Sequence, residues 1–136
     1  MTDAVTATNS GPNRVTILLV EDETPVRLLV RRILERQGYR VVEAETGGAA
    51  LRVWPQCRDR VRILLTDLVM PEGISGSELA QKLQADQPSL KVIFTSGYSR
   101  EFMGEDFRPG GTLTFLEKPY DPKQLTDAIR ACLETP

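Results

Sequence analysis

Apolar residues along this chain fall into short unbroken runs that alternate with longer stretches of mixed polarity. An unbroken run rich in β-branched residues is typical of a strand that is covered on both faces of a parallel sheet. A shorter and more polar run suits a strand at the edge of a sheet. The pattern predicts strands over 15–20, 61–66, 90–95 and 112–116, and an edge strand over 40–44.

Two of the stretches between these runs carry the i, i+3, i+4, i+7, i+8 spacing of a buried helical face. Pro25 and Gly38 mark the start and the end of the first helix, and Asp121 with Pro122 indicates the N-cap and first residue of the last one. The predicted buried faces are Val26, Leu29, Val30, Ile33 and Leu34 in the first helix, and Leu125, Ala128, Ile129, Cys132 and Leu133 in the last.

Weaker patterns predict three more helices. Ser75 and Glu78 have the spacing of a capping box that opens one of them. A second covers 46–54 and ends at Pro55, and a short third helix over 99–107 supplies the fourth connection. Strict alternation of strands and helices predicts an α/β fold, in which right-handed crossovers place helices on both faces of a parallel sheet.

Composition narrows the class of protein. The chain has 136 residues, 40% of them hydrophobic, 26% charged, and a net charge of -2, which is typical of a soluble globular protein. We expect one folded domain over 14–136 after a loose polar tail over 1–13. No basic excess indicates a nucleic-acid partner, and no apolar run or signal-peptide pattern indicates a membrane, so we expect a cytoplasmic location.

Histidine is absent from the sequence. This excludes histidine-ligated metal sites, nucleophilic machinery that depends on histidine, and a phosphohistidine on this chain. Cys57 and Cys132 form no CxxC pair, and we expect both to be small buried residues.

Charged side chains follow three of the predicted strands at their carboxyl ends. Glu21 and Asp22 follow the first strand, Asp67 the third and Lys118 the fifth. Each has an ordinary interpretation, such as a solvated loop residue or a turn aspartate. In a parallel sheet, however, these ends meet at one edge, where like charges repel unless a cation or Lys118 relieves them. Oxygen ligands without histidine favour Mg²⁺.

This cluster has the parts required for phosphoryl transfer. A carboxylate beside Mg²⁺ can attack phosphorus and form an aspartyl phosphate. The charge on the transferred group must be neutralised, and Mg²⁺, the Lys118 ammonium and the hydroxyl of Ser96 or Thr95 can supply this.

Four blocks of sequence occur in the order and at the spacing of one known family. They are Leu19 to Asp22, Leu65 to Pro71 with Gly76, Ser96 with Gly97, and Leu116 to Pro119. On the basis of these blocks, the chain resembles bacterial response-regulator receiver domains from Arg14 to its end. It is similar to receivers associated with hybrid sensor histidine kinases. The resemblance implies a flavodoxin-like (βα)5 three-layer sandwich with a parallel five-stranded sheet of order 2-1-3-4-5.

The resemblance also implies a role for each site residue. Asp67 accepts a phosphoryl group from a partner sensor histidine kinase. Asp22 and the backbone carbonyl of Val69 bind Mg²⁺ together with Asp67, and Glu21 acts largely through water. Lys118 matches the lysine of the family.

A switch is implied as well. Ser96 is favoured over Thr95 as the switch hydroxyl because a small residue follows it. Phe115 holds the aromatic switch position, with an ordinary core phenylalanine as the alternative. Tyr98, together with Val69, would flank the phosphoryl group and lengthen its lifetime.

A signalling domain is therefore expected, one that catalyses only its own phosphorylation and dephosphorylation. It would act on a downstream protein target, with a phosphorylation-dependent homodimer as a further partner. Because no output domain follows the last helix, a phosphate sink or relay intermediate is an alternative. An aspartyl-nucleophile phosphatase is disfavoured because Val69 stands where those enzymes place a second acid. A receiver that binds partners without phosphorylation is disfavoured because Asp67 and Lys118 are both present.

Overall fold

A computed structural model of the protein describes residues 15–68, 73–96, 113–118 and 121–134, with only the backbone described at 96 and 113. Strands and helices alternate along the first part of the chain, as the sequence pattern indicates. The elements are β1 (Thr16–Val20), α1 (Thr24–Arg36), β2 (Arg40–Ala44), α2 (Gly47–Cys57), β3 (Val61–Asp67), α3 (Gly76–Asp86), β4 (Lys91–Ser96), β5 (Leu113–Glu117) and α4 (Pro122–Glu134). All predicted strands are confirmed, and their ends differ from the prediction by at most one residue.

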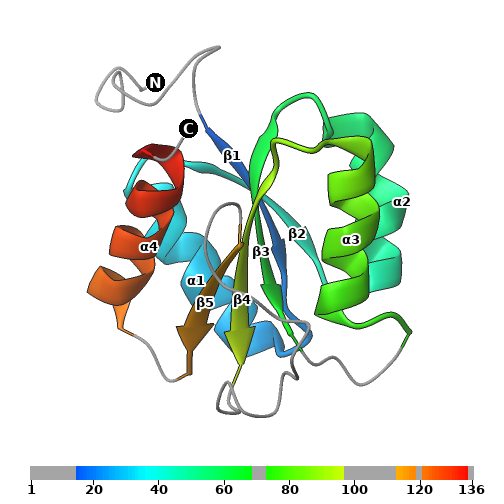
Figure 1. Ribbon diagram of the computed structural model, residues 1–136. Helices are drawn as coiled ribbons and strands as arrows, with labels where there is room; N and C mark the ends of the chain where they lie inside the picture. The colour runs from blue at the N-terminus through cyan, green and yellow to red at the C-terminus, as the bar shows by residue number, and fades with distance from the viewer. Residues whose placement is uncertain (1–14, 69–72, 97–112, 119–120, 135–136) are drawn as a thin grey trace.

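The strands form one sheet of order β2-β1-β3-β4-β5, and every neighbouring pair is parallel. The arrowheads therefore point toward the same edge of the sheet, the lower edge in Figure 1. The order reverses between β1 and β3, which is the place where ligands bind in open α/β sheets. The predicted fold class and strand order are confirmed.

Helices cover both faces of the sheet and make three layers. Helices α1 and α4 lie on one face, and α2 and α3 lie on the other (Figure 1). All five residues of β1 are buried. Its alternate side chains enter two separate hydrophobic clusters, Ile17 and Leu19 on the α1 and α4 side, and Leu18 and Val20 on the α2 and α3 side.

Local signals for the helix ends are confirmed. The Ser75 hydroxyl accepts the Glu78 N–H at 3.1 Å, and the Glu78 carboxylate accepts the Ser75 N–H at 3.1 Å. Asp121 caps α4 by accepting the Gln124 N–H at 2.7 Å. After the C-cap of α1, Gly38 adopts a φ of 94°, a left-handed conformation in which glycine pays no penalty for a Cβ atom.

The predicted end of the second helix is wrong, because α2 continues through Pro55 to Cys57. Proline removes one backbone donor and crowds the preceding turn. The buried side chains of Trp54 and Cys57 belong to the core, and their packing offsets this cost. The last turn is closed by a 2.8 Å hydrogen bond from the Arg58 N–H to the Trp54 carbonyl.

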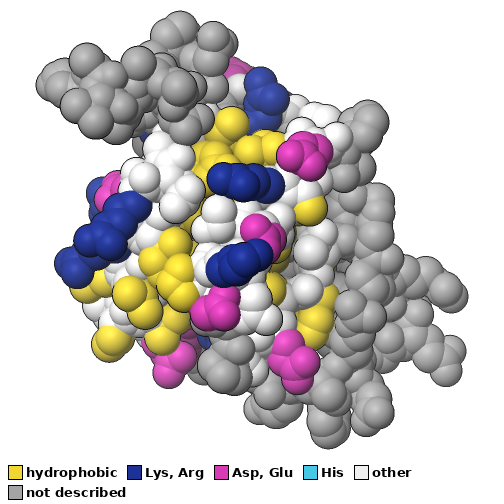
Figure 2. Space-filling view, turned by 90° about the vertical axis from the view of Figure 1, so that its left-hand side faces the viewer, with side chains coloured by type: hydrophobic (Ala, Val, Ile, Leu, Met, Phe, Trp, Pro, Cys, Tyr) yellow, Lys and Arg dark blue, Asp and Glu magenta, His cyan; other side chains and the backbone are white. Residues whose placement is uncertain are grey.

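Two leucines assigned to buried helical faces are in fact exposed. Leu29 of α1 is 58% exposed and Leu133 of α4 is 37% exposed. Val30 and Leu34 of α1 are buried in the core and Val26 and Ile33 pack against it, so Leu29 lies beyond the margin of the contact. Figure 2 views the α1 and α4 side, where hydrophobic side chains lie among charged ones.

Cys57 and Cys132 are buried free thiols, as expected. In the part of the chain that the structure describes, no helix is long and apolar enough to cross a membrane. The expected tail over 1–13 and the helix predicted over 99–107 lie outside the described residues.

Candidate functional site

Acidic and basic side chains from three strands meet at the carboxyl edge of the sheet. Glu21 and Asp22 follow β1, Asp67 is the last residue of β3, and Lys118 follows β5. One carboxylate oxygen from each of Glu21, Asp22 and Asp67 lies within 4.8 Å of the other two. The Lys118 ammonium lies 3.0 Å from Glu21 Oε1 and 3.3 Å from Asp67 Oδ2. The structure therefore brings these four predicted residues into one cluster.

The members of the cluster differ in their access to solvent. The side chain of Glu21 is only 3% exposed, whereas Asp67 and Lys118 keep 13% and 21%. Burial raises the pKa of Glu21, while hydrogen bonds from Lys118 and from the Glu23 N–H oppose the shift. Burial alone would lower the pKa of Lys118, but the hydrogen bond to Glu21 and the charge of Asp67 outweigh it and raise this pKa.

This donor set fits a small divalent cation. Three carboxylate oxygens from Glu21, Asp22 and Asp67 lie close enough to share one ion, and they are the hard oxygen ligands that Mg²⁺ prefers. Both oxygens of Glu21 already accept hydrogen bonds, Oε1 from Lys118 and Oε2 from the Glu23 N–H. Asp22 is therefore better placed than Glu21 for direct contact with an ion.

The backbone around Asp67 is fixed from two sides. The Leu68 N–H donates to the Thr95 carbonyl at 2.8 Å, and the Gly76 N–H donates to the Leu68 carbonyl at 3.0 Å. The first turn of α3 also packs on Asp67, because a Cβ atom on Gly76 would lie 2.1 Å from the Asp67 carbonyl oxygen. Only glycine fits at this position without a backbone shift, a requirement that the sequence motif alone did not explain.

The remaining predicted residues are described in part. Thr95 is 2% exposed. Ser96 ends β4, but its side chain lies outside the described residues, as do Val69 and Tyr98. Phe115 of β5 is partly buried and packs against the hydrophobic cluster on the α2 and α3 side.

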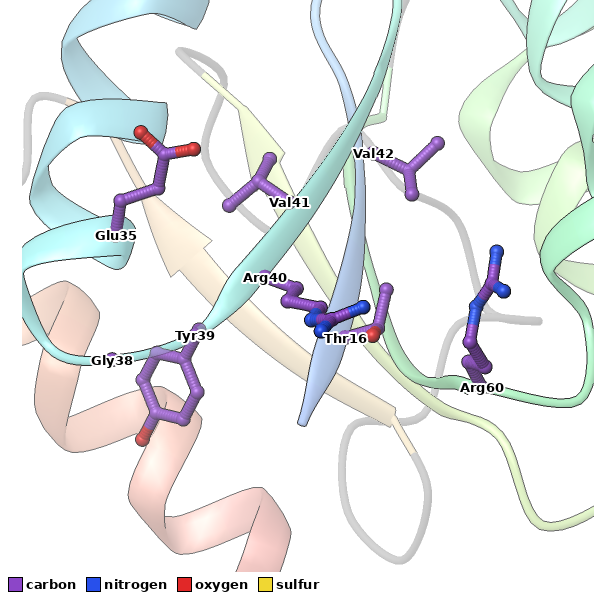
Figure 3. Close-up of a pocket in the computed structure, with 8 residues that line it drawn as sticks. All are labelled: Thr16, Glu35, Gly38, Tyr39, Arg40, Val41, Val42 and Arg60. Atoms are coloured by element: carbon purple, nitrogen blue, oxygen red, sulfur yellow. The ribbon is translucent and has the colours of Figure 1, made fainter. Parts of the chain in front are cut away.

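A hollow of about 390 Å³ lies at the opposite edge of the sheet, where the strands begin. Figure 3 shows Thr16 at the start of β1, Arg40 at the start of β2, and Arg60 before β3 around it. The Thr16 hydroxyl is buried and has no hydrogen-bond partner among the residues that the structure describes. None of the clustered acids lines this hollow, so it is separate from the site described above.

Comparison with known proteins gives consistent results. The family model described as the response regulator receiver domain matches residues 17–130. The chain is 38% identical over 119 residues to the sensor kinase CckA of Brucella abortus, covering 88% of this chain but only 12% of that protein. It is 32% identical over 117 residues to the response regulator receiver protein CpdR of the same species, covering 86% of this chain and 95% of that protein.

A solved structure is similar as well. The crystal structure of the receiver domain from the hybrid histidine kinase CckA aligns with a TM-score of 0.74 and 34% identity. The alignment covers 88% of this chain and 99% of that one. The similarity to CckA is thus confined to a receiver portion of a much longer protein.

Proposed function

Because the chain belongs to the response regulator receiver domain family of two-component signalling, we propose that Asp67 accepts a phosphoryl group from the phosphohistidine of a sensor histidine kinase. The observation that carries the proposal is the cluster at the sheet edge. A carboxylate nucleophile, two further carboxylates and an ammonium group share one small volume. This is the donor set needed to hold a cation and a phosphoryl group together.

In the transfer step, a carboxylate oxygen of Asp67 forms a bond to phosphorus as the bond from phosphorus to the histidine nitrogen breaks. The electron pair of the broken bond stays on the imidazole of the donor. Asp22, Asp67 and the backbone carbonyl of Val69 would hold Mg²⁺, and Glu21 would act through water, since both of its oxygens are already engaged. When bound, Mg²⁺ supplies positive charge to the phosphoryl oxygens.

The Lys118 ammonium supplies the second positive charge. It already contacts the Asp67 carboxylate, so it can donate to an oxygen of the phosphoryl group attached there. The Ser96 hydroxyl, with Thr95 as the alternative, donates to another oxygen. These donors lower the energy of the transferring group without taking part in covalent chemistry.

Signalling follows from the added charge. The phosphoryl group brings a strong negative charge and new hydrogen-bond acceptors, which draw the Ser96 hydroxyl inward. Phe115 then moves into the vacated space, and the surface near β5 changes shape for a downstream protein or a second copy of the chain. By the family resemblance, Val69 and Tyr98 would flank the phosphoryl group and limit the access of water, which would slow its hydrolysis.

Labelling with acetyl phosphate tests the acceptor. We expect wild-type protein to take up one phosphoryl group, measured by intact mass, in Mg²⁺ but not in EDTA. Asp67→Asn should abolish the label and Asp22→Asn should reduce it strongly. Asp127→Asn is the matched control, because this exposed acid pairs with Lys123 away from the cluster. Labelling of Asp67→Asn at the wild-type level would contradict the proposal, and sustained turnover of a phosphomonoester would favour the phosphatase alternative.

A further inference from the structure

Arg27 of α1 links the tips of β1 and β2. Its Nη1 donates to the Glu21 carbonyl oxygen at 2.9 Å, and its Nε donates to Glu43 Oε1 at 3.1 Å. The side chains of Arg27 and Glu43 are only 11% and 20% exposed. A guanidinium offers several donors in a fixed plane, so both contacts depend on one orientation of the side chain.

The Glu21 carbonyl is a sensitive point in the cluster. It belongs to the planar peptide group that joins Glu21 to Asp22. On the other side of the Glu21 Cα atom, the N–H donates to the Ala44 carbonyl at 3.1 Å. The chain leaves β1 here, so the bond from Arg27 fixes the peptide plane where the strand ladder no longer does. The orientation of this plane sets the direction in which the Asp22 side chain leaves the backbone.

We propose that Arg27 is a positioning residue for the metal site. Anchored by Glu43, its guanidinium holds the peptide between Glu21 and Asp22 so that the Asp22 carboxylate faces Asp67. This inference rests on the proposed function, since it assumes that the acidic cluster binds Mg²⁺. Arg27 acts through the backbone of Glu21 and is not itself a ligand.

The positive charge of Arg27 and its positioning role would have opposite effects on Mg²⁺ affinity, and this makes the proposal testable. A positive charge near a cation site repels the cation. If Arg27 acted only through its charge, its removal would tighten Mg²⁺ binding. If Arg27 positions the Asp22 carboxylate, its removal weakens binding, because the outer contacts that orient metal ligands typically contribute about ten- to a hundredfold in affinity.

Arg31 provides a matched control on the same helix. It pairs with the other oxygen of Glu43 and with Glu35 at 3.0 Å, but no contact joins it to Glu21 or Asp22 within the described chain. Loss of Arg31 therefore removes a positive charge and an ion pair with Glu43 while leaving the Glu21 carbonyl bond in place.

Titration of each variant with Mg²⁺ alone, followed by calorimetry or by amide NMR shifts, measures the effect. We expect Arg27→Gln to bind Mg²⁺ about tenfold more weakly than wild type and Arg31→Gln to bind it at least as tightly as wild type. Arg27→Lys keeps the charge but cannot make both contacts at once, so we expect weakened binding there too. Glu43→Gln, which retains Arg27 but weakens its anchor, should show a smaller loss.

Three outcomes separate the possibilities. Melting followed by circular dichroism shows whether Arg27→Gln is folded. If it is folded and binds Mg²⁺ as tightly as wild type or more tightly, the positioning role is overturned. If that variant does not fold, unchanged affinity in both Arg27→Lys and Glu43→Gln overturns it instead. Wild-type protein that does not bind Mg²⁺, or binds it as well after Asp22→Asn, contradicts the metal site itself and with it the proposed function.

Discussion

The Lys118 ammonium lies 3.3 Å from the Asp67 carboxylate, although 51 positions separate the two residues in the sequence. Strand β4 lies between β3 and β5, so the contact spans the tips of three neighbouring strands. Lys118 also lies 3.0 Å from Glu21. It is thus a counter-charge that offsets part of the negative charge of these carboxylates before any cation binds.

Replacing this counter-charge should make stability depend on Mg²⁺. We expect Lys118→Met to lower the free energy of unfolding in EDTA by about 2 kcal/mol, less than for a fully buried pair because the cluster keeps some solvent contact. Mg²⁺ should reduce the loss, since a bound cation replaces the ammonium charge. Urea unfolding with and without Mg²⁺ measures both values.

Lys123→Met serves as the control for that measurement. Lys123 forms an exposed i,i+4 pair with Asp127, and such pairs contribute little to stability. Its effect should be the same in EDTA and in Mg²⁺. An equal loss under both conditions for Lys118→Met would show that Lys118 does not act as the counter-charge.

Because α3 approaches β3 closely at Gly76, we expect a single added methyl group there to reduce both stability and labelling. Gly76→Ala would place a Cβ atom 2.1 Å from the Asp67 carbonyl oxygen, and backbone atoms on both sides must shift to relieve the clash. We expect a loss of about 1–3 kcal/mol in stability and slower acetyl phosphate labelling, because the shift moves Asp67.

Gly48→Ala is the corresponding control. Its added Cβ atom would have no neighbour closer than 3.7 Å, and alanine favours a helix over glycine by up to about 1 kcal/mol. We therefore expect this variant to be more stable than wild type and to label normally. Normal labelling of Gly76→Ala at full stability would contradict the role given to the α3 contact.

The fold could be predicted because its signals are local. Strand runs, the Ser75 cap and the Asp121 cap are each read from neighbouring residues, and parallel alternation then restricts the topology. The acidic cluster could be predicted for a related reason. Once strands are assigned as parallel, their carboxyl ends must share an edge, and the strand order implied by the family resemblance then places Asp67 and Lys118 near each other.

Features that depend on distant packing could not be predicted. The end of α2 is decided by the burial of Trp54 and Cys57, whereas sequence rules consider only the local cost of Pro55. The exposure of Leu29 depends on how much of α1 the sheet covers. The contact of Arg27 with Glu43 joins residues 16 positions apart, and no local pattern indicates which of the many arginines would make it.

An ion pair between Arg58, which follows α2, and Asp86 of α3 predicts a response of stability to acid. Hydrogen bonds from Arg58 and from the Trp54 indole hold the pKa of Asp86 below its ordinary value of 3.8. A carboxyl with a lowered pKa stabilises the folded state above the unfolded value, and this contribution is lost as the pH falls through the folded one. We expect Asp86→Asn to melt at a lower temperature than wild type at neutral pH, and the difference to shrink as the pH falls below 3.8 and to disappear below the lowered pKa of the folded state.

Melting followed by the fluorescence of Trp54, the sole tryptophan, checks this expectation directly. Asp59→Asn is the control, because Asp59 also pairs with Arg58 but its side chain is 88% exposed. The Asp59 variant should follow wild type at every pH. A constant difference between Asp86→Asn and wild type across the acidic range would show that ionisation of Asp86 is not responsible.

Exposed leucine on α1 predicts a contact with the phosphoryl donor. The helix begins just after the acidic pair, so we expect a partner that delivers phosphate to Asp67 to contact its first turns. We expect Leu29→Ser to slow transfer from a histidine kinase that labels wild type by about tenfold, the effect of losing 1.4 kcal/mol at an interface. Labelling by acetyl phosphate should not change.

Leu133→Ser is the matched control, since Leu133 is also exposed but lies near the far end of α4, away from the strand tips. Its transfer rate should equal that of wild type. Equal rates for Leu29→Ser and wild type would place the donor on another surface.

The position of each strand in the sheet gives the site a fixed part and a movable part. The carboxylates extend from β1 and β3, which have hydrogen-bonded neighbours on both sides, whereas Lys118 follows β5, which pairs with β4 alone among the described strands. Backbone amides of β1 and β3 should be among the last to exchange with solvent, and those of β5 among the first. When the site binds different ligands, we therefore expect the Lys118 side chain to move toward or away from the carboxylates, which stay in place.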